Sequence, residues 1–458
     1  MAIFIKSKND TKKMMLNVLI ALVPIILFSI YKNGYLPYTH NKTDLFGLFY
    51  PLIFILVGSL TSLIAETIYA LITKKKGYFK RSYGFMPGLF LSLILPLRTP
   101  ILILIAACLV ATIIGKLIFG GFGKNIFNPA LIGYVFMLIC FSNVFSTNNY
   151  LNNYELDTIS KATPLTNASF VTGIGSYDEL VKPYGSLSNF FIGTIPGAIG
   201  EVSALLCLVA FIYLTLTKTI KWKISVTYVA TVFIITYIIG RLLGQGVYYP
   251  LFHILSGGLM FGAVFMATDP VTSAVTPIGQ VLQGLLLGIS TVILRFLGVE
   301  GVAISILFVN MLVFLLDKIG AKARFNFLKA ILYFILICII ILASGVILAS
   351  GKRSDKKDPN FEIISKEKNN NQIIYVVNQK GYAGNIKGEI ILENKKVVSF
   401  KILKHYESKD RYELILKEDY LSKLITNQTN LDNIDTISSA TITSNALKRM
   451  LNNVLLDN

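Results

Sequence analysis

The stretch MMLNVLIALVPIILFSIY, residues 14–31, decides the fold class of this chain. It is almost wholly apolar, and a helix of about 20 such residues spans the hydrocarbon core of a bilayer. Comparable blocks recur at 14–31, 46–72, 84–96, 100–118, 129–145, 194–216, 224–242, 251–267, 279–297, 301–317 and 327–350. We therefore expect an α-helical polytopic membrane bundle of about ten spans plus one anchor helix.

The composition excludes a soluble globular protein. Hydrophobic residues make up 54% of the chain and charged residues only 15%, whereas soluble domains carry about 25% charged residues. The formal net charge is +18, but the basic residues are spread over the short loops between apolar blocks. A nucleic-acid-binding protein gathers such residues on one face, so we expect no nucleic-acid partner.

Lys and Arg are concentrated in alternate loops, and this bias predicts an orientation in the membrane. Residues 6–13, 74–81 and 218–223 are rich in them, and short loops of this kind stay in the cytoplasm. We therefore expect a cytoplasmic N-terminus. The polar loop at 146–193 and all residues after Ser350 then lie outside.

The chain divides by composition into a membrane domain at 1–320, an anchor helix at 327–350 and a polar tail at 351–458. The tail contains the strand-like stretches QIIYVV, GEIILE, KKVVSFKIL and RYELIL. Its closing segment, SNALKRMLNNVLLDN, has the spacing of an amphipathic helix. About 100 residues suffice for a small α+β domain, which we expect outside the membrane.

Metal-based electron carriers are not expected. The four cysteines lie inside apolar blocks without a CxxC pair, and the three histidines are far apart in the sequence. This pattern matches neither an iron–sulfur cluster nor a zinc site. If the chain carries electrons, its carrier is therefore organic.

A repeated heptad is the most informative motif. DTISKAT, residues 157–163, lies in the external loop, and DTISSAT, residues 435–441, lies in the tail. Six of the seven positions agree between two otherwise unrelated segments. A capping turn before a helix would explain either copy alone, but it explains the repetition poorly.

Each heptad ends in a threonine whose hydroxyl can be esterified. The pattern resembles D-x-x-[ST]-G-A-T, in which a dedicated flavin transferase joins the phosphate of FMN to the threonine oxygen. The resemblance assigns Thr163 and Thr441 as the sites of two covalent, phosphoester-linked FMN groups. The recognition residues that it implies are Asp157, Ser160, Asp435 and Ser438. The usual glycine is Lys161 in one copy and Ser439 in the other. A side chain at this position disfavours a backbone conformation with positive φ and crowds the transferase, or Lys161 could instead neutralise the flavin phosphate.

Further stretches extend the resemblance over nearly the whole chain. NIFNPA at 125–130, GAIGEVSA at 197–204, and the segment from Gly257 to FMATDPVT at 265–272 make residues 1–320 similar to the D subunit of the Rnf complex. That subunit is related to the B subunit of the sodium-pumping NADH:quinone oxidoreductase. Residues 327–458 resemble the neighbouring G subunit, an anchor helix with an FMN-binding domain. The matching pieces there are GYAG at 381–384, HYES at 405–408 and the terminal heptad.

This resemblance implies an electron-transfer subunit of an ion-translocating ferredoxin:NAD⁺ oxidoreductase in a bacterial inner membrane, inactive on its own. It implies partner subunits that handle NADH and iron–sulfur clusters, a flavin transferase, and Na⁺ or H⁺ as the transported ion. It allows a further non-covalent riboflavin or other flavin in the membrane domain. His405 and Glu407 are expected to line the flavin of the tail.

Three carboxylates, Glu66, Glu201 and Asp269, lie in or beside apolar blocks, where charges are costly and usually serve an ion path. The alternative for Glu201 is an interfacial residue at a helix start, where the helix dipole favours negative charge. For Asp269 the alternative is a cap in front of Pro270.

Three other functions stay open. The chain could belong to a Na⁺-translocating NADH:quinone oxidoreductase as a B/C-type subunit. It could be a non-redox transporter with an external ligand-binding module. It could also relay electrons to an external acceptor without pumping ions.

Overall fold

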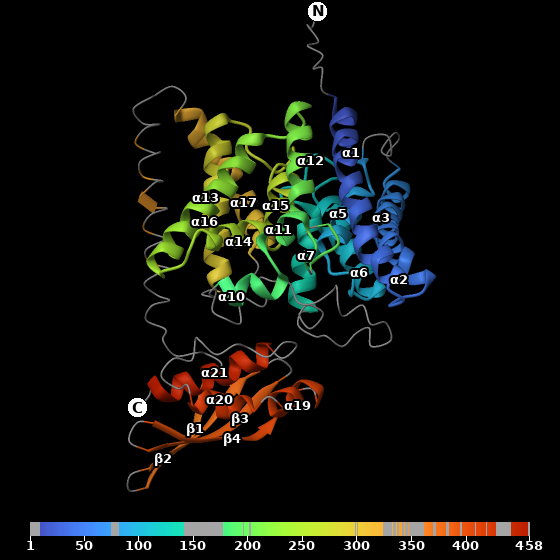
Figure 1. The fold of residues 1–458 in the computed structure, drawn as a ribbon. Coiled ribbons are helices and arrows are strands. Elements are labelled where there is room, and N and C mark those ends of the chain that lie inside the picture. The colour runs from blue at the N-terminus through green and yellow to red at the C-terminus, as the bar shows by residue number, and fades with distance from the viewer. Residues whose placement is uncertain are drawn as a thin grey trace, which may run out of the picture. The chain divides into compact units, whose positions relative to one another are not determined.

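The chain forms two compact units, Met1–Lys352 and Arg353–Asn458 (Figure 1). The computed structural model describes residues 10–74, 82–141, 177–195, 197–200, 203–297, 299, 301–323, 332, 336, 339–340, 343, 347, 361–369, 372–381, 384–393, 396–407, 409–417, 419–426 and 441–456. Each unit is considered by itself below.

The regular elements in the described part of the first unit are helices, joined by turns and loops. Its elements are α1 (Thr11–Ile30), η1 (Tyr31–Tyr35), α2 (Leu36–Thr39), α3 (Leu45–Ile72), α5 (Met86–Ile94), α6 (Ile101–Thr112), η2 (Ile113–Leu117), α7 (Pro129–Cys140), α10 (Tyr177–Leu180), η4 (Lys182–Tyr184), α11 (Leu187–Ile192), α12 (Ala204–Leu216), α13 (Trp222–Leu242), α14 (Tyr248–Leu255), α15 (Leu259–Phe261), η5 (Gly262–Met266), α16 (Pro277–Phe296) and α17 (Val302–Ala323).

Side chains that bind free backbone N–H groups mark where several of these helices begin. Asp44 accepts a hydrogen bond from Gly47 N at the start of α3. Asn128 and Thr276 do the same before α7 and α16, and a proline follows each of them at the first helical position. Proline is favoured there because the N–H that it lacks would have no partner in the helix.

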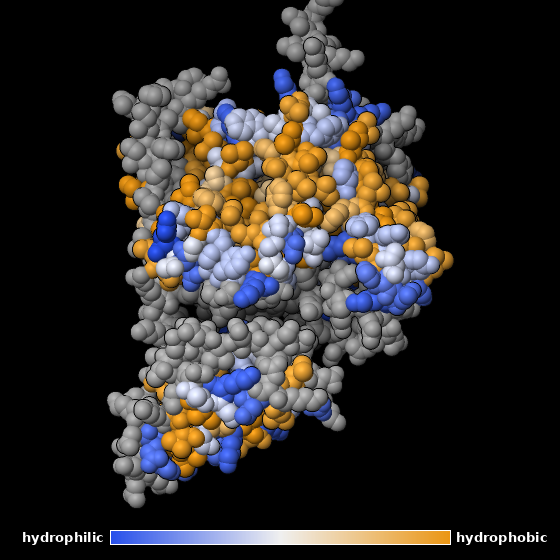
Figure 2. All heavy atoms as spheres, viewed as in Figure 1, coloured by the Kyte–Doolittle hydropathy of each residue, from blue (hydrophilic) through white to orange (hydrophobic). Residues whose placement is uncertain are grey.

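The helical unit is a multi-pass membrane protein. Five of its described helices are long and apolar enough to span a bilayer, or six if α14 and the α15–η5 segment form one bent span. Three shorter apolar helices are Ile101–Leu117, Pro129–Cys140 and Ala204–Leu216. On the face shown in Figure 2, hydrophobic residues form a broad band across this unit, with hydrophilic residues at both ends of the helices. The expected count of about ten spans stays a prediction.

Close helix packing in this unit depends on small residues. A Cβ atom added to Gly88 of α5 would lie 1.9 Å from the backbone oxygen of Gly58 on α3. Only glycine therefore allows α5 and α3 to approach this closely, as is typical of helix pairs in membranes. The short block expected at 84–96 is this helix α5, which ends at Ile94.

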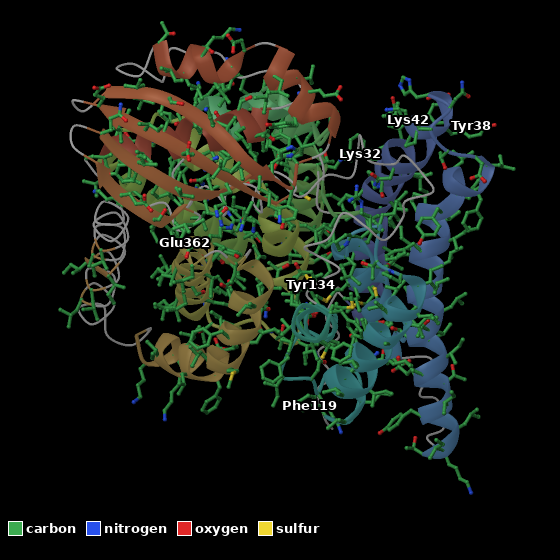
Figure 3. The ribbon with its side chains drawn as sticks, turned by 90° about the horizontal axis from the view of Figure 1, so that it is seen from below. Lys32, Tyr38, Lys42, Phe119, Tyr134 and Glu362 are labelled. Atoms are coloured by element: carbon green, nitrogen blue, oxygen red, sulfur yellow. The ribbon has the colours of Figure 1, made fainter. Side chains whose placement is uncertain are left out.

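Several described segments of the unit leave regular α-helical geometry. The helix pair α14 and α15–η5 is bent by 64° at a break after Leu255. The turns η2 and η5 are π-helical, a geometry that often occurs at functional sites. A third π-helical turn, η1, follows α1 and carries the buried Lys32, whose ammonium donates to Ile195 O. Figure 3 locates Lys32 near Tyr38 and Lys42, which follow it in the chain.

The second unit contains a four-stranded antiparallel sheet with the order β1-β2-β3-β4. Its elements are β1 (Phe361–Asn369), β2 (Gln372–Lys380), β3 (Asn385–Glu393), β4 (Lys396–His405), α19 (Lys409–Lys417), α20 (Tyr420–Thr426) and α21 (Thr441–Leu456). Buried side chains of the sheet form one core with those of α19, α20 and α21. The α+β prediction for the tail is confirmed.

Two details of the tail differ from the sequence-based expectations. The stretch RYELIL was expected to be a strand, but it lies in helix α19, where Ile415 is buried and Leu416 exposed. A short apolar run fits the residue spacing of a strand as well as that of a helix, so burial in the folded domain decides which of the two forms. Strand β1 was not anticipated, whereas the closing helix was, and it begins at Thr441.

Candidate functional site

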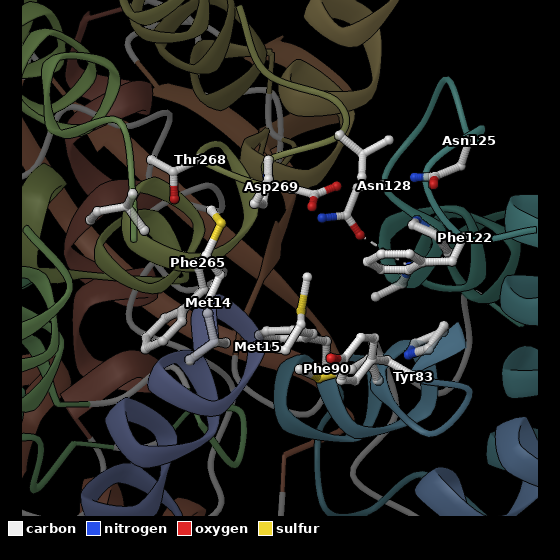
Figure 4. A pocket seen from close by; sticks show the side chains of 18 of the residues that line it. Met14, Met15, Tyr83, Phe90, Phe122, Asn125, Asn128, Phe265, Thr268 and Asp269 are labelled. Carbon is white, nitrogen blue, oxygen red and sulfur yellow. Dashed lines mark hydrogen bonds between the residues drawn. The ribbon is translucent and has the colours of Figure 1, made fainter. Parts of the chain in front are cut away.

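A pocket lies within the helical unit (Figure 4). Its walls come from α1, the segment 83–90, η2, the loop before α7, the region 214–220, η5 and the loop that follows η5. The residues that line it are Met14, Met15, Val18, Tyr83, Met86, Pro87, Phe90, Lys116, Phe122, Asn125, Asn128, Pro129, Ala130, Leu214, Thr219, Ile220, Val264, Phe265, Thr268, Asp269, Pro270 and Val271. Segments far apart in the sequence therefore build one site.

Aromatic rings form two parts of the pocket wall. Phe90 and Phe265 lie with ring centroids 6.3 Å apart, and Tyr83 and Phe122 lie 5.5 Å apart. Such rings offer flat apolar surfaces on which a planar conjugated ligand can stack.

Polar groups are few in this pocket, and most of them, including Asn125, Asn128 and Asp269, are on its loops. Asn125 Nδ2 donates to Phe127 O at 2.9 Å, and Asn128 Oδ1 accepts from Ala130 N at 3.1 Å. Asn128 and Asp269 both line the pocket, where Figure 4 labels them. A largely apolar cavity with a few placed polar groups is the usual form of a cofactor site.

Asp269 is half-buried on the loop between η5 and α16. Thr272 Oγ1 donates to Asp269 Oδ2 at 3.2 Å, and Ser273 Oγ donates to Asp269 O at 2.6 Å. Loss of hydration raises the pKa of the Asp269 carboxyl above its usual value, although Thr272, the Val271 N–H and Lys221 favour the charged form. The sequence singled out this residue, and the structure places it at the pocket.

The loop that carries Asp269 is tied down from two sides. Lys221 Nζ donates to Ser273 O at 2.9 Å and to Ser273 Oγ at 2.8 Å. The Asp317 carboxylate accepts hydrogen bonds from the backbone N–H groups of Val275 and Thr276 at 2.8 to 3.0 Å. A rigid loop holds its carboxylate in one place, as a binding site requires.

Glu66, a candidate ion-path residue, is buried on α3 and pairs with Lys116 of η2. Lys116 Nζ lies 3.0 Å from Glu66 Oε2, and both side chains are almost fully buried. The same ammonium donates to Ser82 O at 2.6 Å and lies 5.6 Å from the centroid of the Phe122 ring. Sequence reasoning overlooked Lys116. Its position inside the apolar block 100–118 was the signal, because a charge there needs a partner.

The tail unit has a second candidate site, at the start of α21. This helix begins at Thr441, and Thr443 Oγ1 donates to Glu407 Oε2 at 2.8 Å. Glu407 is buried, and a Cβ atom on Gly381 would lie 2.2 Å from Glu407 Oε1. The structure therefore brings Glu407 and Gly381 to the first turn of the helix that Thr441 opens.

His405, the other residue expected near the tail flavin, ends strand β4. Its ring stacks on Tyr412 of α19, with centroids 3.6 Å apart and planes inclined by 23°. This contact explains the position of His405 by packing between β4 and α19. Its role at a flavin stays a prediction.

Several expected site residues lie outside the described part of the chain. They are Asp157, Ser160, Thr163, Glu201, Asp435 and Ser438, together with most of the external loop 146–193 and of the anchor helix 327–350. For Thr441 the backbone is described but the side chain is not.

Comparison with known proteins gives two family matches. Residues 1–326 match the model of the NQR2, RnfD, RnfE family, and residues 381–456 match the FMN-binding domain. The D subunit of the proton-translocating ferredoxin:NAD(+) oxidoreductase complex of Clostridium ljungdahlii is 31% identical, over 70% of this chain and 94% of its own length.

Two other relatives have the same level of identity. The D subunit of the Na(+)-translocating ferredoxin:NAD(+) oxidoreductase complex of Acetobacterium woodii is 31% identical over 71% of this chain and 94% of its own length. The B subunit of the Na(+)-translocating NADH-quinone reductase of Chromohalobacter salexigens is 31% identical over 55% of this chain and 61% of its own length.

Proposed function

Because the chain belongs to the NQR2, RnfD, RnfE family and carries an FMN-binding domain, we propose that it is an electron-transfer subunit of an Rnf-type, ion-translocating ferredoxin:NAD⁺ oxidoreductase. The observation that carries this proposal is the union of both parts in one chain, each with a copy of the same heptad. The two relatives whose names mention ferredoxin match over most of their length, whereas the quinone reductase relative matches over less. This difference favours the Rnf type over the quinone-reducing type.

We further propose that Thr441 and Thr163 each carry FMN through a phosphoester bond. Thr441 lies within the part that matches the FMN-binding domain and begins a helix of 16 residues. The free N–H groups and the dipole at a helix start stabilise a phosphate, so this position suits a phosphate-linked cofactor. Glu407 positions the first turn through its hydrogen bond with Thr443.

The residues of the pocket fit a non-covalent flavin such as riboflavin. Phe90 and Phe265 offer apolar faces for the isoalloxazine ring, and Asn125 and Asn128 offer amide groups for its polar edge. When bound, this group would supply one- and two-electron redox chemistry inside the helical unit. The chain itself would orient the ring, exclude water from it and hold Asp269 beside it.

Ion coupling is proposed to use carboxylates near the carriers. Asp269 borders the pocket, whereas Glu66 is already paired with Lys116. Asp269 and Glu201 are therefore the better candidates for transient Na⁺ or H⁺ occupancy.

Other members of the complex would handle NADH and ferredoxin, and a flavin transferase would load the threonines. We place the protein in the bacterial cell membrane, with a cytoplasmic N-terminus and an extracytoplasmic tail.

Intact-mass analysis of the full chain, produced together with a flavin transferase, tests the covalent part. We expect two FMN adducts in the wild type, one in Thr163→Ala or Thr441→Ala, and none in the double variant. Thr158→Ala and Thr436→Ala, within the same heptads, serve as matched controls and should keep both adducts. A wild-type protein without adducts would support the non-redox transporter instead. Ion flux measured in vesicles containing the complex separates a pump from a simple electron relay.

A further inference from the structure

Only one partner of the ion pair between Glu66 and Lys116 lines the pocket. Lys116 lines the pocket, whereas Glu66 lies behind it on α3 and does not belong to the lining. The ammonium reaches toward Phe122, which also lines the pocket, at 5.6 Å from the ring centroid. The pair is neutral as a whole, but the side that it presents to the pocket is positive.

Stability alone is a poor reason for such a pair. Removing two charges from water costs more than their attraction in the interior usually returns, and apolar residues of similar size are often at least as stable there. Glu66 Oε1 is buried without a hydrogen-bond partner in the described part of the chain, so the carboxylate is not fully compensated. Costly, incompletely satisfied charges inside a membrane protein point to a functional use.

We propose that Lys116 tunes the redox group of the pocket, by favouring its reduced form, and that Glu66 limits this effect. The inference rests on the proposed non-covalent flavin. Reduction of an isoalloxazine by one electron without a proton, or by two electrons with one proton, adds one negative charge. The nearby ammonium attracts that charge strongly, because the surroundings are apolar and screen it little. In this proposal Lys116 transfers no proton and acts only through the charge that it places beside the pocket.

This role predicts opposite effects for the two partners. Lys116→Met removes the positive charge at the pocket and leaves the Glu66 carboxylate, so the midpoint potential of the pocket flavin should fall. Glu66→Gln leaves Lys116 uncompensated, so the potential should rise. The double variant loses both charges, and the lost lysine charge has the larger effect on the flavin because it is nearer to the pocket. The midpoint potential of the double variant should therefore lie between those of Lys116→Met and the wild type.

The measurement is a spectroelectrochemical titration of the purified full chain in a Thr163→Ala, Thr441→Ala background, where the remaining flavin is the non-covalent one. We expect the ratio of affinities for reduced and oxidised riboflavin to fall at least tenfold in Lys116→Met, which is about 30 mV for a two-electron couple. Lys124→Met, at an exposed position on the neighbouring glycine-rich loop, is the matched control and should leave the potential unchanged.

The order of the potentials separates charge tuning from a structural role. A pair that only holds the wall together would make both single variants lose riboflavin affinity alike in its two redox states. Equal potentials in all variants, or shifts of the same sign in Lys116→Met and Glu66→Gln, would overturn the inference while leaving a flavin in the pocket. Absence of acid-extractable flavin from the wild-type protein would overturn the inference and the proposed pocket cofactor together.

Discussion

The pocket of the helical unit and the start of α21 in the tail unit differ in how the chain builds them. The pocket draws on seven separate regions between Met14 and Val271, spread over most of the helical unit. The tail site draws on a turn at Gly381, the end of β4 and the first turn of α21. A site made from many helices depends on the packing of the whole unit, whereas the tail site depends on one small domain.

The largest effect that would sharpen this comparison is expected for Gly88→Val. The added side chain would collide with the backbone of Gly58 and displace α5, which carries Pro87 and Phe90 of the pocket wall. Overpacking of this kind costs about 1–3 kcal/mol or more. We expect loss of the acid-extractable flavin, with an unchanged FMN adduct on Thr441 in the same sample.

Leu60→Val, at an exposed position on α3, is the control for Gly88→Val and should keep both flavins. Wild-type amounts of extractable flavin in Gly88→Val would show that the pocket tolerates movement of α5. The pocket would then depend on the packing of the helical unit no more than the tail site does.

A smaller effect, confined to the other region, is expected for Thr443→Val. The Glu407 carboxylate loses a buried hydrogen bond of 2.8 Å, and such a loss costs about 1–3 kcal/mol. The first turn of α21 should become less ordered, so we expect slower FMN incorporation at Thr441 and unchanged extractable flavin. Time-resolved intact-mass analysis measures the incorporation.

The matched control for this substitution is Thr426→Val on α20, which removes an exposed hydrogen bond to Ser422 O. It should leave the rate of incorporation as in the wild type. If Thr443→Val also loads FMN at the wild-type rate, Glu407 does not position the attachment site.

The smallest expected effect is on the pH dependence of the protein's stability, and it comes from Asp269. Burial raises the pKa of this carboxyl in the folded protein, so the folded state binds more protons than the unfolded state. Stability should therefore decrease as the pH rises from the ordinary Asp pKa of about 3.9 through the raised value, and stay constant above it. Asp269→Asn should remove this slope, which thermal unfolding in detergent at a series of pH values can measure. An identical slope in the variant would assign it to another group.

Local features of the chain were predictable from the sequence. The block 279–297 corresponds to α16 at Pro277–Phe296, and the block 224–242 corresponds to α13 at Trp222–Leu242. Both helices are predictable because their residues are almost continuously apolar and because residues typical of a helix start, such as Thr276 followed by Pro277, mark their ends. The closing helix of the tail follows from its amphipathic spacing in the same way.

Contacts between distant segments were not predictable in this way. Lys116 and Glu66 are 50 positions apart, and nothing in the local pattern of either block indicates their pairing. Asn125, Asn128 and Asp269 were noticed as parts of separate motifs, but only tertiary packing brings them to one pocket. RYELIL was assigned wrongly because an apolar run of this length fits a strand as well as a helix.

The π-helical turn η2 makes the orientation of Lys116 sensitive to chain length. A π-helical turn holds one residue more than an α-helical turn, so removing Ile114 would let the backbone continue as regular α-helix. Residues after Leu117 would then keep nearly the same faces, whereas Lys116, which lies inside the turn, would lose the backbone position from which it reaches Glu66, without a change in any charge. Insertion or loss of one amino acid is therefore a simple way for related sequences to switch such a contact on or off.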